Sequence, residues 1–413
     1  MKKIILIFLF CSSIFAVQFG TINFGKDTAK KAIKKWHEKN SQISNEEEIW
    51  PEINKNPKFQ LQGFNLCAWG KDWYSDKDLV KKALKFVLEE GANLVILDWA
   101  VNFNDDGTIV EYEKSLHPYW EDIEWLIQKA KSLGLYVMLK PHTTLSNSPE
   151  NRNYDNTTVD ENHFSPTKFF NDYKEYLLNL CNFASKNKVD FLCIGTEKSH
   201  IDWQPELRDD WIDIIDMVRK NFSGEITYDA LFNRWSRNVK DIEEVIFLDQ
   251  LDFIGISLYV PITTNDDADV ETIKRGWRED LGEIYGGPGW FEINDVVQYL
   301  YDIVVSSYNK KLMAVEGGYQ SKGEGALYYV NNSSFTYEHD KLQSRGLEGY
   351  FSVIGEENKK GWILGITVWD LTPYMISDDN LKTPWHTQSF SVYNKPAAEV
   401  VKKYYYNLIG DSR

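Results

Sequence analysis

The sequence predicts a single (β/α)8 (TIM) barrel of the α/β class, preceded by a short N-terminal helical arm. From about Leu61 onward, short runs rich in β-branched and aromatic residues alternate with longer segments of helical period. This alternation is typical of parallel strands joined by crossover helices, and eight strand runs match the number that closes this barrel. A doubly wound open sheet is the rival architecture, but the glycine-rich turn expected after its first strand is missing from residues 66–70.

Each predicted strand is a short apolar run, and most are followed by a segment whose apolar residues recur with a helical period. Gly91 and Gly134 each end a predicted helix just before an apolar run, as a glycine after a last helical turn does. The strands are predicted at 63–69, 93–99, 136–140, 190–196, 225–230, 253–259, 311–315 and 362–369. The helices are predicted at 78–90, 118–133, 166–186, 205–220, 239–247, 294–308, 340–356 and 396–405.

The N-terminal end has a secretory signal pattern, in which Lys2 and Lys3 precede an apolar run and small residues end at Ala16. The apolar run is far shorter than the roughly 20 residues of a membrane-spanning helix. We therefore expect a secreted or periplasmic protein with no integral membrane segment after signal removal. A lipid anchor at Cys11 is the alternative, although the bulky Phe10 before it is a poor neighbour for that processing.

The remaining chain divides into an arm and one large unit. We expect a signal peptide at 1–16, an N-terminal arm at 17–58 with a helix at 27–39, and the barrel at 59–413. Cys67, Cys181 and Cys193 remain after signal removal, and three thiols cannot all pair. Since Cys67 and Cys193 fall in apolar strand runs, we expect free buried cysteines that act as small hydrophobes.

Charge and aromatic content limit the possible partners. The chain has 46 Lys and Arg against 62 Asp and Glu, and its net charge is -16. A phosphate backbone would be repelled by this field, so we expect no nucleic-acid partner. Aromatic residues make up 15% of the chain, which indicates either an aromatic-rich core or a surface that stacks on flat ligand faces.

Two glutamates follow predicted strands four and seven. Glu197 comes directly after the apolar run 191–196, and Glu316 comes directly after 312–315. Active sites of such barrels are built at the C-terminal ends of the strands, and strands four and seven face each other nearly across that mouth. Two opposed carboxylates separated by a sugar-sized gap are the machinery of glycoside hydrolysis.

Around these residues the chain resembles the clan A glycoside hydrolases, and in detail family 113, whose characterised members are endo-β-1,4-mannanases. The resemblance extends from the first predicted strand to the C-terminus. The matching stretches are Met138-Leu139-Lys140-Pro141-His142, Ile194-Gly195-Thr196-Glu197, the run 251–259, Val315-Glu316-Gly317-Gly318-Tyr319, 362–366 with Trp369-Asp370, and Asn394-Lys395-Pro396-Ala397-Ala398.

The resemblance implies a retaining double displacement with Glu197 as the acid/base and Glu316 as the nucleophile. It also implies that His142 lies beside the reacting sugar, that Tyr259 donates a hydrogen bond to the nucleophile, and that Trp369 is the platform under the sugar ring. Tryptophan offers a flat face for the apolar C–H face of a sugar. The further candidates for substrate binding are Trp69, Trp99, Trp203 and Asn233.

Two departures from the family pattern stand in this sequence. Thr196 precedes the acid/base where most of clan A has Asn, as family 113 tolerates. The polar position of the fifth strand is Asn233 or Asp229, and the sequence leaves both open.

The function expected from these residues is a secreted retaining hydrolase that cleaves β-1,4-linked mannan or a related β-hexose polysaccharide without a cofactor. A non-catalytic carbohydrate-binding barrel and a glycosidase of different sugar specificity are the alternatives. A metal-dependent hydrolase is disfavoured because the seven histidines lack the close pairs that metal ligands usually form.

Overall fold

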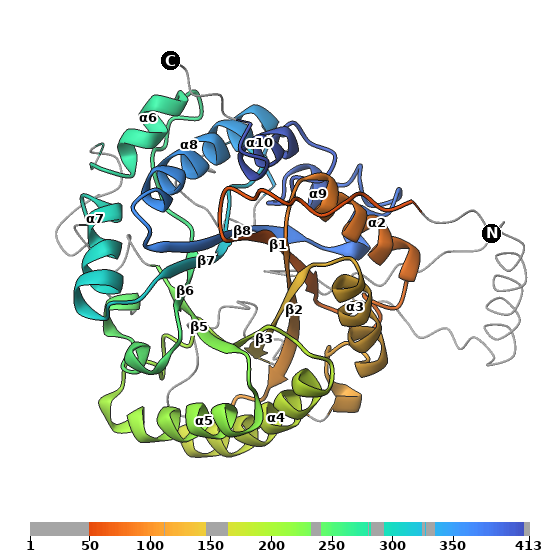
Figure 1. Cartoon of the computed structure of the whole chain (residues 1–413), viewed down its shortest axis with the longest axis vertical. Coiled ribbons are helices and arrows are strands. Elements are labelled where there is room, and N and C mark those ends of the chain that lie inside the picture. The colour runs from red at the N-terminus through yellow and green to blue at the C-terminus, as the bar shows by residue number, and fades with distance from the viewer. Residues whose placement is uncertain are drawn as a thin grey trace, which may run out of the picture.

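Eight parallel strands close into a barrel in chain order, and helices surround it (Figure 1). This computed structural model describes residues 49–110, 112–145, 164–232, 241–279, 281, 293–323, 327 and 335–408. The strands are β1 (Leu61–Ala68), β2 (Leu94–Phe103), β3 (Tyr136–Leu145), β4 (Phe191–Thr196), β5 (Glu225–Leu231), β6 (Ile254–Leu258), β7 (Leu312–Gly317) and β8 (Ile363–Leu371). The predicted (β/α)8 TIM barrel is therefore confirmed.

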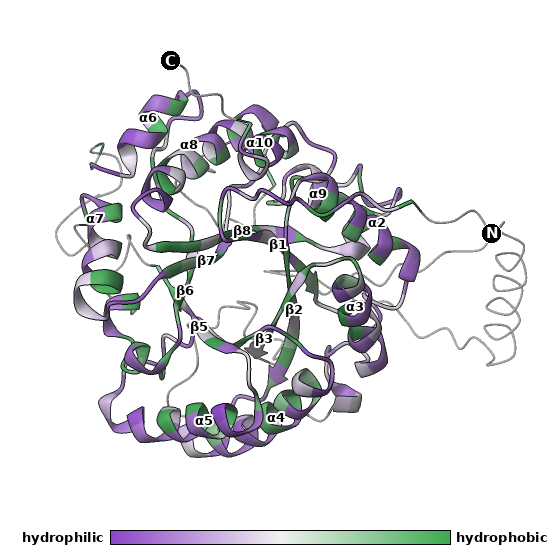
Figure 2. Cartoon of the chain, in the orientation of Figure 1, coloured by the Kyte–Doolittle hydropathy of each residue, from purple (hydrophilic) through white to green (hydrophobic). Residues whose placement is uncertain are grey.

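The helices that surround the strands are α2 (Lys77–Glu89), α3 (Trp120–Ser132), α4 (Pro166–Lys186), α5 (Arg208–Asn221), α6 (Val270–Gly276), α7 (Val296–Tyr301), α8 (Asp340–Asn358), α9 (Pro384–Thr387) and α10 (Ala397–Tyr405). Figure 2 shows green and purple segments alternating along α4 and α5, whose buried residues are apolar. The helix predicted at 294–308 is α7 continued by a π-helical segment, Asp302–Ser307.

The prediction of a helix at 239–247 is wrong, because the described part of this segment forms a single 3-10 turn at Ile242–Glu244, and a second 3-10 turn follows the segment at Leu248–Gln250. The backbone N–H of Ile246 donates to the carbonyl of Asp202 at 3.0 Å instead of to the preceding helical turn. This tertiary bond interrupts the i to i−4 ladder that an α-helix needs.

Side chains alternate between the two faces of each strand, and this alternation decides which residues can meet inside the barrel. Leu94 and Ile96 of β2 and Met138 of β3 belong to a compact apolar cluster of the barrel interior. Two residues further along, Asp98 and Lys140 continue the same inward-facing rows and are register partners in the β2–β3 pair. The inner face therefore changes from apolar to charged toward the C-terminal ends of the strands.

Several expectations about the ends of the chain lie outside the described residues. The signal peptide at 1–16, with Cys11, and the arm helix at 27–39 fall there, and residues 49–58 form no helix or strand. In the described ranges, no helix has the length and apolar character needed to cross a bilayer. Cys67, Cys181 and Cys193 are buried and free, as expected.

Candidate active site

Most of the predicted site residues lie at the C-terminal ends of the strands. Glu197 directly follows β4, Tyr259 directly follows β6, and Glu316 is the penultimate residue of β7. Trp69 directly follows β1, and Trp369 is the third residue from the end of β8, which pairs with β7.

Glu316 is 4% exposed, and each of its carboxylate oxygens has a donor from a different part of the barrel. The hydroxyl of Tyr259 donates to Oε2 at 2.9 Å. The ammonium of Lys140 donates to Oε1 in a close ion pair. Burial raises the pKa of the Tyr259 hydroxyl well above its ordinary value, and the charge of Glu316 raises it further. Tyr259 therefore stays protonated and is the donor in this hydrogen bond.

Lys140 is fully buried and contacts three carboxylates. Its Nζ lies 2.7 Å from Oδ2 of Asp98 and 3.1 Å from Oδ2 of Asp229, in addition to its contact with Glu316. The hydroxyl of Ser257 forms a hydrogen bond of 3.0 Å with Oδ1 of Asp229. The contacts of Lys140 with Asp229 and Glu316 are hydrogen bonds, and its contact with Asp98 is an ion pair.

The pKa values of the two buried aspartates in this cluster are shifted in opposite directions. Burial raises the pKa of Asp229 well above its ordinary value, and the charges of Glu316 and Glu197 add to the effect of burial against that of Lys140. Burial alone would also raise the pKa of Asp98, but Lys140 and His142 lower it below its ordinary value. Lys140 and His142 therefore favour the ionised form of Asp98, whereas burial and the neighbouring carboxylates disfavour the ionised form of Asp229.

Strand β5 fixes the backbone of Glu197. The backbone N–H of Glu197 donates to the carbonyl of Asp229 at 2.8 Å, and the next N–H, of Lys198, donates to the hydroxyl of Tyr228 at 2.6 Å. Glu197 has φ of 47°, a left-handed conformation that side-chain-bearing residues seldom adopt without such support. The partly exposed Glu197 is thus aimed by contacts that its own strand does not supply.

Three partly exposed aromatic side chains form a wall beside the carboxylates. The ring centroids of Trp69 and Trp369 are 5.8 Å apart, and those of Trp69 and His142 are 5.1 Å apart. Nζ of Lys140 lies 5.2 Å from the centroid of Trp369, so the wall adjoins the charged cluster. Nδ1 of His142 also lies 3.7 Å from Oδ1 of Asp98.

The structure does not support the prediction that Trp99 binds the substrate, because this residue is 0% exposed and cannot stack on a ligand. The strand β2 continues to Phe103, so Trp99 is not at its end, and it follows the inward-facing Asp98 and therefore faces outward. Its indole Nε1 donates to the hydroxyl of Tyr176 at 3.0 Å, in the layer between strands and helices.

The other two predicted binding residues are Trp203 and Asn233. Trp203 is partly exposed in the loop after Glu197. Asn233 lies outside the described residues, as does much of the long loop after β3. Of the two residues open for the fifth strand, Asp229 is in the site.

The residues that sequence reasoning missed are Asp98 and Lys140. Each is a charged side chain at an inward-facing position of an otherwise apolar strand, and that alternation was readable from the sequence. Ligand atoms of Asp98, His142 and Glu316 lie within 4.8 Å of one another, a spacing that could hold a metal ion. The ammonium of Lys140 contacts two of these three groups and is the cation of the cluster.

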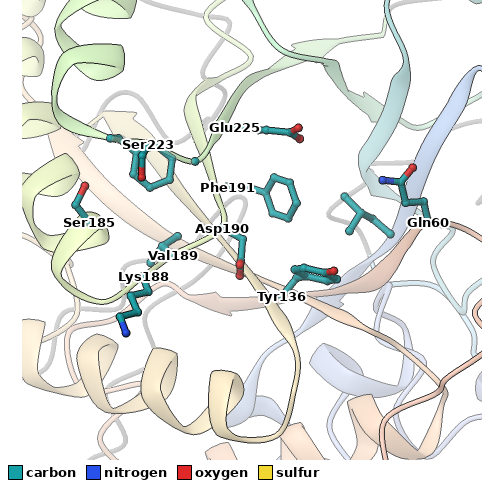
Figure 3. Close-up of a pocket in the computed structure, with 12 residues that line it drawn as sticks. Gln60, Tyr136, Ser185, Lys188, Val189, Asp190, Phe191, Ser223 and Glu225 are labelled. Carbon is teal, nitrogen blue, oxygen red and sulfur yellow. The ribbon is translucent and has the colours of Figure 1, made fainter.

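A pocket of about 520 Å³ lies at the opposite end of the barrel (Figure 3). It is lined by Gln60, Tyr136, Asp190 and Glu225, which are near the N-terminal ends of their strands, together with Phe191. Glu197 is at the other end of β4 from Phe191. Catalytic residues of these barrels lie at the C-terminal face, and the N-terminal face serves stability.

Comparison with known proteins agrees with this fold. The model of Glycoside Hydrolase Family 113 matches residues 63–395. A search of curated proteins finds no match.

Solved structures share the fold at low identity. A GH113 β-1,4-mannanase, solved as a complex, has a TM-score of 0.63 at 22% identity over 84% of this chain and 98% of its own. The GH113 β-mannanase AaManA from Alicyclobacillus acidocaldarius, in complex with ManMIm, has a TM-score of 0.66 at 19% identity over 86% and 100%. XacCel5A in complex with cellopentaose has a TM-score of 0.50 at 14% identity over 84% and 99%.

Proposed function

The chain belongs to glycoside hydrolase family 113, and we propose that it is a secreted retaining hydrolase of β-1,4-linked mannan or a related β-hexose polysaccharide. Glu316 is the proposed nucleophile and Glu197 the proposed acid/base. Membership of this family makes the chain a glycoside hydrolase; the substrate, the mechanism and the secretion are the proposed part.

The observation that carries the proposal is the setting of Glu316. A nucleophilic carboxylate must be ionised, and it is stabilised by donors that cost no reorganisation during the reaction. Tyr259 donates to one oxygen of Glu316 and Lys140 to the other. Both proposed catalytic residues also raise the pKa of Asp229 by their charges, so both act on the same point of the barrel mouth.

The two carboxylates then perform a double displacement. In the first step Glu316 attacks the anomeric carbon, and Glu197 gives its proton to the glycosidic oxygen as the bond to it breaks. In the second step Glu197 takes a proton from water, the oxygen of that water attacks the anomeric carbon, and Glu316 leaves as a carboxylate. The sugar leaves with the anomeric configuration that it had in the polymer.

The aromatic wall supports a sugar polymer as the substrate. Trp69, His142 and Trp369 are partly exposed and mutually in contact, and flat aromatic faces bind the apolar C–H faces of sugar rings. We assign Trp369 to the platform under the reacting ring. Two structural neighbours are β-mannanases and one was solved with cellopentaose, so mannan and glucan are the substrates to compare.

Product analysis on mannan, glucomannan, cellulose and xylan tests this function. We expect release of manno-oligosaccharides from mannan, and of products from glucomannan, by the mature enzyme. If products were released only from cellulose or only from xylan, that polysaccharide would replace mannan as the proposed substrate. Release from none of the four, by folded enzyme, would contradict the proposal and favour a non-catalytic sugar-binding barrel. The secretion is tested by N-terminal sequencing of the exported protein, which should lack residues 1–16.

A further inference from the structure

We propose that Lys140 is a positioning residue for the nucleophile: its ammonium holds the carboxylate of Glu316 in place, and Asp98 anchors that ammonium. The inference rests on the proposed role of Glu316 and assigns a task to two residues that are buried below it. It differs from a purely structural account, in which Lys140 only neutralises Asp98.

The side chain of Lys140 reaches Glu316 across the interior of the barrel. Its side chain comes from β3 and Glu316 from β7, and both are buried. Asp98 is the register partner of Lys140 on the adjacent β2, and Oδ2 of Asp98 lies 2.7 Å from Nζ. Asp98 and Glu316 both contact the ammonium of Lys140, so the ion pair with Asp98 fixes the position of that ammonium beside Glu316.

Charge explains why Glu316 needs this contact. A carboxylate that is 4% exposed has little water to stabilise its ionised form. Burial lowers the pKa of Lys140, but Asp98, Glu316 and Asp229 together raise it well above its ordinary value, so Lys140 remains a cation. The titratable groups that face this cluster from the strands are Cys67, Asp98, Lys140, His142, Cys193, Glu197, Asp229, Tyr259 and Asp370.

The three carboxylates in contact with Lys140 would repel one another if all were ionised. Burial and the neighbouring carboxylates raise the pKa of Asp229 and so disfavour its ionised form, and the ammonium of Lys140 offsets the charges of the other two carboxylates, Asp98 and Glu316. Removal of Lys140 alone would leave those anions buried without a cation, and such a variant can fail to fold for reasons unrelated to catalysis. The double variant Lys140→Met/Asp98→Asn removes the cation together with its anchoring anion and separates the two accounts.

The test is covalent labelling by 2,4-dinitrophenyl 2-deoxy-2-fluoro-β-mannoside, with the β-glucoside as a second probe. Glu316 would bond to the anomeric carbon, and dinitrophenolate would leave with the electron pair of the broken bond, so no proton from Glu197 is needed. The labelling rate against pH then reports the ionised nucleophile, and mass spectrometry of the labelled peptide identifies it. Lys131→Met is the matched control, because it removes a lysine–aspartate pair, with Asp190 at 2.7 Å, outside the site.

In the double variant we expect labelling to be roughly 10- to 100-fold slower than in the wild type, because Glu316 has lost the charge-assisted hydrogen bond that holds its Oε1. Lys131→Met should keep the wild-type profile. A folded double variant with the wild-type labelling rate would overturn the inference and leave Lys140 a structural role. Failure of both probes to label wild-type Glu316 would instead contradict the proposed function.

Asp98→Asn keeps the cation but removes its anchor, and it tests the inference even if the double variant does not fold. We expect slower labelling at the plateau than in the wild type. Labelling at the wild-type plateau rate would contradict the role of Asp98 as the anchor.

Discussion

The hydroxyl of Tyr259 donates a hydrogen bond of 2.9 Å to Oε2 of Glu316. Tyr259 directly follows β6 and Glu316 is in β7, so two adjacent strands of the barrel bring donor and carboxylate together. Because the pKa of this hydroxyl is raised by burial and then by the charge of Glu316, the donor stays protonated throughout the range in which enzymes work.

Replacement of Tyr259 by Phe should lower kcat roughly 10- to 100-fold, because a hydrogen bond to a charged group contributes about 1.5–3 kcal/mol. The measurement is steady-state hydrolysis of a manno-oligosaccharide. Tyr404→Phe is the matched control, since the hydroxyl of Tyr404 donates to Oε1 of Glu348 at the same 2.9 Å between outer helices. If the two variants lost the same small amount of activity, Tyr259 would have no special part in the site.

Replacement of Glu316 by Gln should lower kcat by roughly 10³-fold or more, as loss of a covalent nucleophile does, while an oligosaccharide still binds. The amide has nearly the shape of the carboxylate but cannot form the glycosyl ester. Calorimetric titration with mannohexaose measures binding, and Glu206→Gln, an exposed position, is the control. Turnover at the wild-type rate would exclude Glu316 as the nucleophile.

Replacement of Glu197 by Ala should lower kcat on mannan by roughly 10²- to 10⁴-fold, the usual contribution of an acid/base. A dinitrophenyl β-mannoside should still form the intermediate, because its leaving group needs no proton. Azide should then raise the rate and yield a β-configured glycosyl azide, which NMR identifies. A variant that azide does not rescue on this substrate would speak against Glu197 as the acid/base.

His117 should make the fold lose stability in acid. Burial lowers its pKa to about 4, from 6.5, while a backbone hydrogen bond to Pro118 opposes the effect. Between pH 6.5 and pH 4 the imidazole of His117 is protonated in the unfolded chain but neutral in the folded chain. The free energy of unfolding therefore falls as the pH drops through this range. The full difference is about 3 kcal/mol.

Urea unfolding at pH 6.5 and pH 4.5 measures this effect. His117→Gln should lose about 2–3 kcal/mol less than the wild type between the two pH values. The pKa of His386 is also lowered to about 4, chiefly by burial, so the double replacement with His386→Gln should lose less still. An equal loss in wild type and His117→Gln would show that His117 is not the group responsible.

Where strand ends coincide with the ends of apolar runs, the sequence predicts them well. The predicted strand at 190–196 agrees almost to the residue with Phe191–Thr196, and the end of this apolar run is what makes Glu197 a candidate site residue. The β2 and β3 strands were predicted to end at Trp99 and Lys140, but they continue to Phe103 and Leu145.

That error has a physical cause. The predicted strand at 136–140 ends at a charged residue, Lys140, because burying a charge is costly unless it is paired. Asp98 and Lys140 are paired with each other across neighbouring strands, and their partner positions depend on barrel register that no single segment reveals. The same error made Trp99 a candidate for sugar binding and left Lys140 without a role.

The most direct test of the account is the anomeric configuration of the first-formed product, followed by ¹H NMR during hydrolysis of mannohexaose. Two carboxylates that act as nucleophile and acid/base give net retention, whereas a water molecule placed between them gives inversion. We predict that the β-anomer of the newly formed reducing end appears first and then mutarotates. Initial appearance of the α-anomer would contradict the double displacement and the assignment of Glu316 as the nucleophile.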